Sequence, residues 1–296
     1  MTRFRSAKAQ AHHAVSRKLA LGQGRHDHQG DGRIHSVGTA RGYEQALKGF
    51  AEYLQTRHLG DLDSATVAKA QQYLDNRADI VAQKTLDLDR QAIQMHLEVQ
   101  LDVVKSNKET ILSTRSYTPA QVERIASAQT ERNSLATQIA YAAGLRAHEL
   151  LTLRPASERQ ASTHREWSTD RFSGRSGERY TVEGKGGLVR EVLLSKTLSD
   201  RLKARRLTEP RQVSDRDVNY VQRYDLGGGK TWSQSFSAAS KRELGYSTGA
   251  HGLRHSYAQQ RMQELQCRGM RYNEARRTVA QEVGHFDKKT TEAYLR

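Results

Sequence analysis

The sequence predicts a mainly α-helical protein with a small antiparallel β-sheet, in which an all-helical N-terminal module precedes an α+β domain. Apolar residues recur at three- and four-residue intervals through residues 39–103, which is the spacing of a helix face. In "RYTVEGKGGLVREVLL", two β-rich runs flank glycine-rich turn residues, a pattern typical of a β-hairpin. The polar segment 105–117 lies between the two halves, and we expect it to be a linker.

The N-terminal module is expected to span residues 38–104 and to contain three or four helices. Its first helix carries one apolar stripe that begins at Tyr43, and Asp63 or Ser64 can cap the second helix. A third helix is expected over residues 83–103. Residues 1–37 combine basic residues, histidines and glycines, so we expect a mobile basic tail with a short helix near residues 9–20.

The C-terminal domain is expected to span residues 118–296 and to begin with a helix that has Pro119 at its first position. The glycine-rich "YDLGGGKT" ends like a phosphate-binding loop, but Tyr224 replaces the first glycine of that motif, so we expect a loop. The spacing of apolar residues predicts helices near residues 119–128, 132–143, 146–153, 197–206, 232–243, 252–267, 272–283 and 288–295.

The charge of the chain favours a polyanionic partner. Lys and Arg number 48 against 33 Asp and Glu, which gives a formal net charge of +15, and most of the excess lies in residues 118–296. The single cysteine, Cys267, excludes an internal disulfide and is expected to pack in the core. No apolar run has the length of a membrane span and no signal core follows the N-terminus, so a cytoplasmic location is expected.

Arginines at helix starts are the first candidates for chemistry. His251 and Arg254 are three residues apart and share one face where a helix begins, a position that favours an anion. Arg146 follows Gly144 and is placed to bring a second guanidinium. Two guanidinium groups around one phosphate would supply bidentate hydrogen bonds and offset the charge of a pentavalent transition state. Taken singly, each arginine is more typical of a surface charge or an ion-pair partner.

Lys185 lies in the turn of the predicted hairpin, where a long side chain can reach into a groove. It could donate a proton to a leaving oxygen or simply contact a DNA backbone. Glu149, three residues after Arg146, could orient that arginine. The pair His251 and His255 has the spacing of a zinc site, but the positions between them lack the acidic residue that a metalloprotease needs, so we expect no metal. Backbone contacts are expected from Arg175, Arg179 and Arg190.

Four fragments in this order resemble the tyrosine recombinase, or phage integrase, family: "GLRAHELL", "GKGGLVREVLL", "HGLRHSYA" and "VGHFDKKTTEAYL". The resemblance covers residues 118–295, the catalytic domain of that family. More loosely, residues 39–100 resemble its helical core-binding (SAM-like) domain. The resemblance implies that Arg146 and Arg254 clamp the scissile phosphate and that Lys185 protonates the departing 5′ oxygen.

The same resemblance implies that Tyr294 is the nucleophile, while His251 and His285 assist by hydrogen bonding and proton handling. Attack by its hydroxyl would make a 3′-phosphotyrosyl link that stores the energy of the broken bond for rejoining. Neither a metal, a nucleotide nor a small-molecule cofactor is then required.

The resemblance therefore implies a site-specific DNA recombinase that integrates or excises a mobile element in the bacterial cytoplasm, associated with the nucleoid when bound. Its partners would be duplex DNA and further copies of the chain, a dimer on one site and a tetramer in synapsis. Two alternatives remain open: DNA relaxation of the type IB topoisomerase kind, and a noncatalytic DNA-binding factor.

Overall fold

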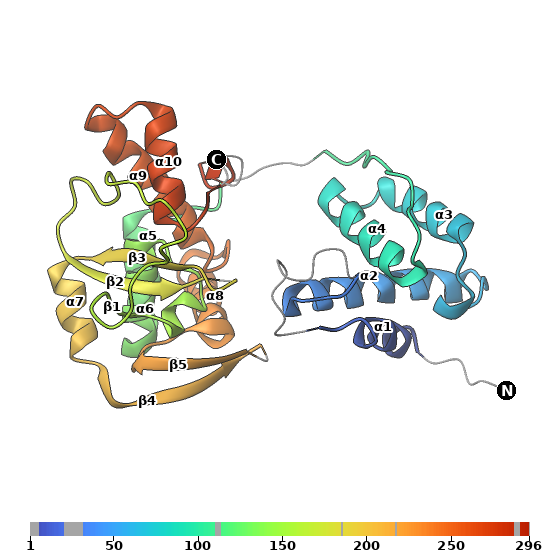
Figure 1. The fold of residues 1–296 in the computed structure, drawn as a ribbon, viewed down its shortest axis with the longest axis horizontal. Coiled ribbons are helices and arrows are strands. Elements are labelled where there is room, and N and C mark those ends of the chain that lie inside the picture. The colour runs from blue at the N-terminus through green and yellow to red at the C-terminus, as the bar shows by residue number, and fades with distance from the viewer. Residues whose placement is uncertain are drawn as a thin grey trace. The chain divides into compact units, whose positions relative to one another are not determined.

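The computed structural model describes residues 6–20, 32–109, 114–184, 186–216, 218–286 and 291–295. The chain divides into two compact units, Met1–Leu112 and Ser113–Arg296 (Figure 1). The division falls inside the segment 105–117 for which the sequence predicts a linker.

The N-terminal unit is all helical, as predicted. It contains the α-helices α1 (Ala7–Ser16), α2 (Val37–Thr56), α3 (Val67–Ala78) and α4 (Gln83–Leu97), and a 3-10 turn at Leu62–Ser64. In Figure 1, α1 lies along one side of α2, and α3 and α4 lie on the other side. The core is aliphatic with two aromatic rings, Phe50 and Tyr73, whose centroids are 5.1 Å apart.

Two expectations for this unit are wrong. The basic N-terminal segment is not a mobile tail over its described residues, because Ala7, Ala11 and Val15 on one face of α1 are buried in the core with α2. Residues 1–5 and 21–31 lie outside the described residues. The third predicted helix ends at Leu97 rather than near residue 103, since Glu98 takes a left-handed conformation (φ 56°) that ends α4.

The C-terminal unit combines helices with two small antiparallel sheets, which confirms the predicted fold class. Thr118 caps α5 in a reciprocal pair with Gln121, and Pro119 takes the first helical position as predicted. A core of aromatic and aliphatic side chains, with Trp232 and Phe236 among its largest, joins the helices to the sheet. The helices are α5 (Pro119–Ser127), α6 (Glu131–Ala143), α7 (Lys196–Lys203), α8 (Gly229–Leu244), α9 (Gly252–Cys267) and α10 (Tyr272–Glu282).

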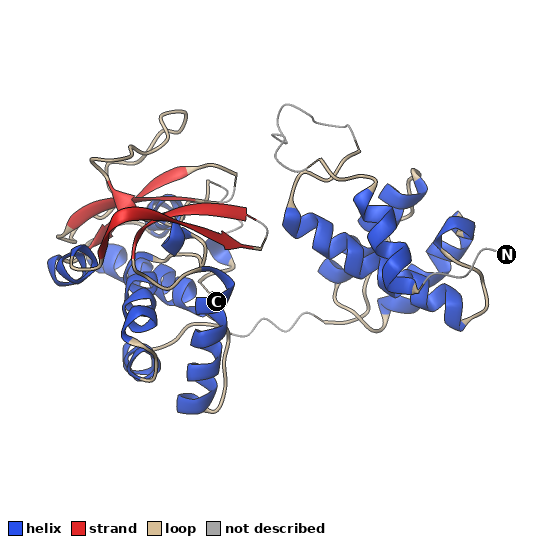
Figure 2. Cartoon of the chain, turned by 90° about the horizontal axis from the view of Figure 1, so that it is seen from below, coloured by secondary structure: helices blue, strands red, loops and turns tan. Residues whose placement is uncertain are grey.

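The three-stranded sheet has the order β1-β2-β3, and all of its pairs are antiparallel. Its strands are β1 (Arg154–Pro155), β2 (Glu178–Glu183) and β3 (Val189–Leu194), and Val182 pairs with Arg190. The predicted hairpin is therefore confirmed. Figure 2 shows the strands gathered on one side of this unit, with most of the helices on the other side.

A second hairpin, β4 (Arg206–Asp215) and β5 (Val218–Tyr224), was not predicted from the sequence. Most of β4 is exposed on both faces, so its residues show no apolar alternation. A register irregularity between Arg206 and Arg211 surrounds Pro210, which cannot donate to a ladder.

Other local expectations also need correction. The helix predicted over residues 146–153 is a single 3-10 turn, Glu149–Leu151, because the chain turns there into β1. In the glycine-rich segment, residues 225–228 form the expected loop, and Gly229 begins α8. The Lys230 amide donates to a carboxylate oxygen of Asp215 (2.7 Å), so this helix start already binds an anionic side chain. Cys267 is exposed rather than packed in the core.

Candidate active site

A helix-ending glycine places Arg146. Gly144 ends α6 in the left-handed conformation (φ 60°), and a Cβ there would lie 2.7 Å from the Tyr257 ring. Only glycine fits this turn without displacing that ring. The chain then turns so that Arg146, two residues later, binds Glu149: its Nη1 lies 2.8 Å from Oε1, and its amide donates to Oε2 at 2.8 Å.

A second glycine places His285 in the same way. Gly284 follows α10 with φ 72°, and a Cβ there would lie 2.8 Å from Cδ of the buried Arg190. The amide of His285 donates to Ala280 O (2.7 Å), which closes the turn at the end of the helix. His285 thereby leaves the helix next to Arg146, and its Nε2 lies 3.0 Å from Arg146 Nη2.

The start of α9 supplies His251 and Arg254. His251 stands at the N-cap, and Arg254 lies in the first turn with no exposed surface. Arg254 Nη1 donates to Gly144 O at 2.6 Å, and its Nη2 donates to Val283 O. These two carbonyls lie at the C-terminal ends of α6 and α10, just before Arg146 and His285 respectively. Arg254 therefore joins the two glycine turns to each other.

Glu149 is the shared anionic partner of three arginines, with hydrogen bonds from Arg146 and Arg190 and an ion pair with Arg254. Its carboxylate lies 2.8 Å from Arg146 Nη1, 2.8 Å from Arg190 Nη2 and 3.9 Å from Arg254 Nη1. Burial alone would raise the pKa of Glu149, but the charges of Arg190, Arg254 and Arg146 outweigh it and hold the pKa well below its usual range. The supporting role predicted for Glu149 thus extends beyond Arg146 to the whole cluster.

Tyr294 lies inside this cluster. Its hydroxyl is 3.1 Å from His285 Nε2, and the guanidinium carbon of Arg254 is 5.3 Å from its ring centroid. Tyr294 as a residue is 7% exposed. The rings of His251 and His255 border it, with centroids at 5.5 and 4.9 Å. Five residues from three separate parts of the sequence therefore lie in one cluster: Arg146, His251, Arg254, His285 and Tyr294.

The contacts of His285 define its protonation. A guanidinium has donors only, so Arg146 requires an unprotonated Nε2 on His285. The Tyr294 hydroxyl faces the same lone pair and shares this acceptor with Arg146. Burial, followed by the charges of Arg254 and Arg146, lowers the pKa of His285 to about 3. At neutral pH the ring is a neutral acceptor that faces the tyrosine.

The other two histidines are also neutral near pH 7. Burial and the charge of Arg115 lower the pKa of His255 to about 4. His251 is exposed as a residue, yet neighbouring atoms desolvate its ring, and this together with the charge of Arg254 lowers its pKa to about 4.

Arg254 offers one unused donor. Its Nε is buried and has no hydrogen-bond partner among the described residues. Burial and the charge of Arg146 lower the pKa of Arg254 to about 10, so the group remains cationic at neutral pH. Two guanidinium groups with an unused donor suit an anion, but the Tyr294 ring covers Arg254 here. Because Arg254 has no exposed surface, an anion can reach it only if a neighbouring group moves, and the Tyr294 ring is one such neighbour.

Lys185 lies outside the described residues, but Gly184, which precedes it, is described. Gly184 donates to Leu188 O (2.8 Å) at the end of the β2–β3 hairpin. A Cβ on Gly184 would lie 3.8 Å from Arg146 Nη1 and 3.5 Å from Glu149 Oε1. The hairpin turn therefore borders the arginine cluster.

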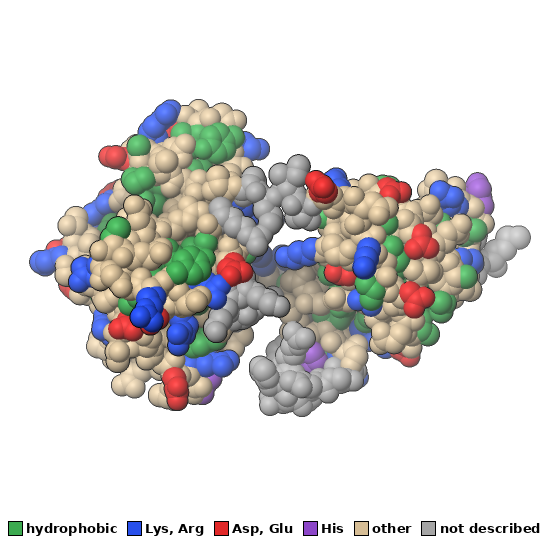
Figure 3. Space-filling view, turned by 90° about the horizontal axis from the view of Figure 1, so that it is seen from above, with side chains coloured by type: hydrophobic (Ala, Val, Ile, Leu, Met, Phe, Trp, Pro, Cys, Tyr) green, Lys and Arg blue, Asp and Glu red, His purple; other side chains and the backbone are tan. Residues whose placement is uncertain are grey.

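The three arginines for which we expected DNA contacts differ in their surroundings. Arg190 is buried, and its Nη1 donates to Glu282 O at 2.7 Å, so its assignment as a DNA contact is wrong. Arg175 forms a two-point ion pair with Glu264, both contacts at 2.8 Å. Arg179 is exposed and lies 3.0 Å from Glu191. Figure 3 shows Lys and Arg side chains spread over one face of this unit, with acidic side chains among them.

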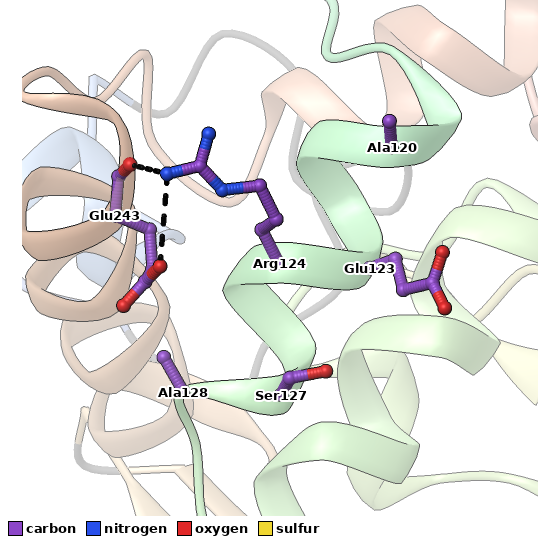
Figure 4. Close-up of a pocket in the computed structure, with 6 residues that line it drawn as sticks. All are labelled: Ala120, Glu123, Arg124, Ser127, Ala128 and Glu243. Carbon is purple, nitrogen blue, oxygen red and sulfur yellow. Dashed lines mark hydrogen bonds and ion pairs between the residues drawn. The ribbon is translucent and has the colours of Figure 1, made fainter.

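No group of three or more His, Cys, Asp or Glu side chains is arranged to hold a metal within the described ranges. Likewise, no helix among the described residues is long and apolar enough to cross a membrane. A shallow pocket between α5 and α8 lies apart from the tyrosine cluster (Figure 4). Two carboxylates line it, and Arg124 already binds Glu243 there, so it does not suit a phosphate.

The comparisons with known proteins identify the fold. No family model and no curated protein matches the chain. Among solved structures, it is similar to the XerH site-specific recombinase in a post-cleavage complex with palindromic difH substrate. The TM-score is 0.59 and the sequence identity is 15%, and the match covers 98% of this chain and 90% of the XerH chain. It is also similar to a lambda integrase dimer bound to a COC′ core site. The TM-score is again 0.59 and the identity 15%, and the match covers 100% of this chain and 82% of the lambda integrase chain.

The chain has the tyrosine recombinase fold. Within this recombinase fold, the sequence motifs led to Arg146, His251, Arg254, His285 and Tyr294, and the structure brings these five together. They did not lead to Arg190 as a buried partner of Glu149, nor to His255 as a neighbour of Tyr294. The i, i+4 spacing of His251 and His255 on α9 was a usable signal for His255, but it was considered only as a zinc pattern.

Proposed function

We propose that this chain is a site-specific tyrosine recombinase that cleaves and rejoins duplex DNA through a 3′-phosphotyrosyl intermediate. The observation that carries the proposal is the place of Tyr294, whose hydroxyl lies 3.1 Å from a neutral His285 nitrogen and whose ring lies against the guanidinium of Arg254. A nucleophile, a proton acceptor and paired cations are the parts that phosphoryl transfer by a tyrosine needs.

The scissile phosphate enters between Arg146 and Arg254 and displaces the tyrosine ring from Arg254. The Tyr294 oxygen attacks phosphorus, and its proton passes to His285 or to the neighbouring His251. The bond from phosphorus to the 5′ oxygen breaks, and Lys185 supplies the proton to that oxygen. Arrival of the anionic phosphate also offsets the charge of the two arginines, which raises the pKa of His285 and makes it a better base.

One phosphoester replaces another, so the covalent intermediate retains the energy needed for rejoining. The reaction as proposed needs neither a nucleotide nor a small-molecule cofactor. Attack by the 5′ hydroxyl of a partner strand on the phosphotyrosine reverses the chemistry and completes the exchange, which serves to integrate or excise a mobile element.

Duplex DNA and further copies of the chain are the proposed partners. The similar structures include a lambda integrase dimer on a core site and a lambda integrase tetramer on a Holliday junction, the latter with a TM-score of 0.56 and 15% identity over 88% of this chain and 72% of that chain. By analogy, we propose a dimer on one site and a tetramer in synapsis, with Arg179 among the backbone contacts.

A nicked duplex taken from DNA that flanks the gene tests the proposal. We expect a protein–DNA adduct that survives denaturing electrophoresis, and we expect Tyr294→Phe to abolish it while binding stays within a few fold. An unchanged adduct yield from Tyr294→Phe would refute the proposed nucleophile. Relaxation of supercoiled plasmid without any specific site would favour the topoisomerase alternative instead.

A further inference from the structure

The C-terminal segment 291–295 packs on helices of its own unit. Thr291 is fully buried, and Tyr294 belongs to an apolar cluster with Ala258 and Met262 of α9 and Val279 of α10. Leu295 packs against the same cluster. The nucleophile proposed above is therefore held within the C-terminal unit of its own chain.

One face of α9 receives this segment. His251, His255 and Gln259 stand at i, i+4 and i+8, and residues with this spacing lie along one side of a helix. The first two border the Tyr294 ring, and Gln259 Nε2 donates to Tyr294 O at 3.3 Å. Most of these contacts involve the ring or the backbone of Tyr294 itself.

These contacts are the ones that catalysis disturbs. The ring covers Arg254, so a phosphate that binds there has to move it, and the stacking on the histidines is then weakened. The burial of Thr291 and the packing of Leu295 then remain, while the hydroxyl must stay close to phosphorus at this step. A polar attachment that does not depend on the ring would hold the segment more firmly.

Arg276 and Glu292 form such an attachment. Arg276 Nη1 of α10 binds the carboxylate of Glu292, two residues before the tyrosine. The Arg276 side chain is mostly buried and also lies over the Tyr272 ring, 5.7 Å from its centroid, so it is not a freely mobile surface group. Of the contacts that the structure describes, this is the one ion pair between the segment and the helices.

We propose that Arg276 and Glu292 are a positioning pair that keeps Tyr294 in the active site of its own chain while its ring moves to admit the phosphate. The inference rests on the proposed function, because only a catalytic Tyr294 has to be held near a phosphate. Neither residue touches the proposed reacting atoms. They act by keeping the hydroxyl at a high effective concentration near phosphorus.

Charge reversal and exchange test the pair. Arg276→Glu, Glu292→Arg and the double exchange are compared in single-turnover adduct formation on the nicked duplex. Each single change should slow adduct formation at least about tenfold, because small misplacements of a reacting group are costly. The double exchange should return the rate to within about threefold of the starting protein. Asp200→Lys, which disturbs the exposed Lys196–Asp200 pair on α7, is the matched control and should leave the rate unchanged.

A second readout does not depend on DNA. Nitration of tyrosines by tetranitromethane, mapped by peptide mass spectrometry, reports whether Tyr294 is covered. We expect slow nitration of Tyr294 in the starting protein and in the double exchange, and faster nitration in each single variant. Tyr246, which is 45% exposed, and Tyr180, which is 2% exposed, are internal references and should not change.

The outcomes separate the two proposals. Single variants that nitrate and cleave like the starting protein, or a double exchange as impaired as the single variants, would overturn the positioning role. If the starting protein forms no adduct on any flanking duplex, the proposed recombination fails, and nitration alone still decides whether Arg276 and Glu292 hold the segment.

Discussion

His285 Nε2 lies 3.1 Å from the Tyr294 hydroxyl and 3.0 Å from Arg146 Nη2, so one imidazole nitrogen faces both the tyrosine and an arginine. This arrangement requires that His285 carry its proton on Nδ1. It also links the proposed nucleophile to a proposed phosphate ligand through a single residue. The local geometry therefore makes specific predictions about protonation, folding and DNA binding.

We expect His285 to remain a neutral Nδ1–H tautomer in the DNA-free protein down to about pH 5, since burial and two arginines hold its pKa near 3. Nitrogen-15 NMR of the imidazole, assigned with His285→Gln, measures this. Addition of a phosphodiester duplex should raise the pKa because the arginines gain an anion. A ring that titrates near its ordinary value without DNA would contradict the contact with Arg146.

Arg190 should support folding rather than bind DNA. Arg190→Met leaves the buried carboxylate of Glu149 without one of its close partners, so the free energy of unfolding should fall by about 3–5 kcal/mol. The salt dependence of DNA affinity should not change. Chemical denaturation and binding at several salt concentrations measure the two effects.

Arg179→Ala is the matched comparison for DNA binding. It should cost at most about 1 kcal/mol of stability, because its ion pair with Glu191 is exposed. It should reduce the slope of log affinity against log salt by about one, as loss of a phosphate contact does. The unmodified protein should lose at least about tenfold in affinity between about 50 and 200 mM salt. A flat response would count against a phosphate-dominated interface.

Gly144→Ala tests the turn that places Arg146. The left-handed backbone alone costs about 1–2 kcal/mol for alanine, and displacement of the Tyr257 ring adds about 1–3 kcal/mol. Gly269→Ala is the control, since its φ is also positive (88°) but no atom lies within 4 Å of the added Cβ. Thermal or chemical unfolding should show the larger loss for Gly144→Ala. Equal losses would mean that contact with Tyr257 does not constrain the turn.

His255 should make stability depend on pH. Its folded pKa of about 4 is below the unfolded value of 6.5, so the unfolded chain takes up a proton first as the pH falls. The stability contributed above about pH 6.5 is therefore lost progressively towards pH 4. Relative to His255→Gln, the unmodified protein should lose up to about 1.4 kcal/mol per pH unit in this window. Parallel pH profiles for the two proteins would contradict a desolvated ring beside Tyr294.

The sequence predicted those parts of the fold that have a local pattern. Pro119, the glycine-rich turn of the first hairpin and the apolar stripes each define an element by themselves. The β4–β5 hairpin has no such pattern, because β4 is exposed on both faces. The helix α1 was predicted too loosely, since its buried residues are mainly alanines among polar neighbours, which give a weak signal.

The residues of the candidate site were predictable from the sequence, but the pairing of its arginines with a buried carboxylate was not. Motif order indicated Arg146, Arg254 and Tyr294 without any distance information. Whether an arginine faces solvent or a buried carboxylate depends on tertiary packing, which is why Arg190 was assigned to DNA although it binds Glu149. Gly144 was noted as the residue before Arg146, but its contact with Tyr257 and the role of Gly284 became interpretable only once their close neighbours were visible.

Mapping of the covalent adduct tests the central claim most directly. The protein is trapped on a nicked duplex, digested with protease and nuclease, and analysed by tandem mass spectrometry. We predict one modified peptide that carries a nucleotide 3′-phosphate on Tyr294, with a free 5′ hydroxyl on the released strand. Attachment at any other side chain, or through a 5′-phosphate, would contradict the account.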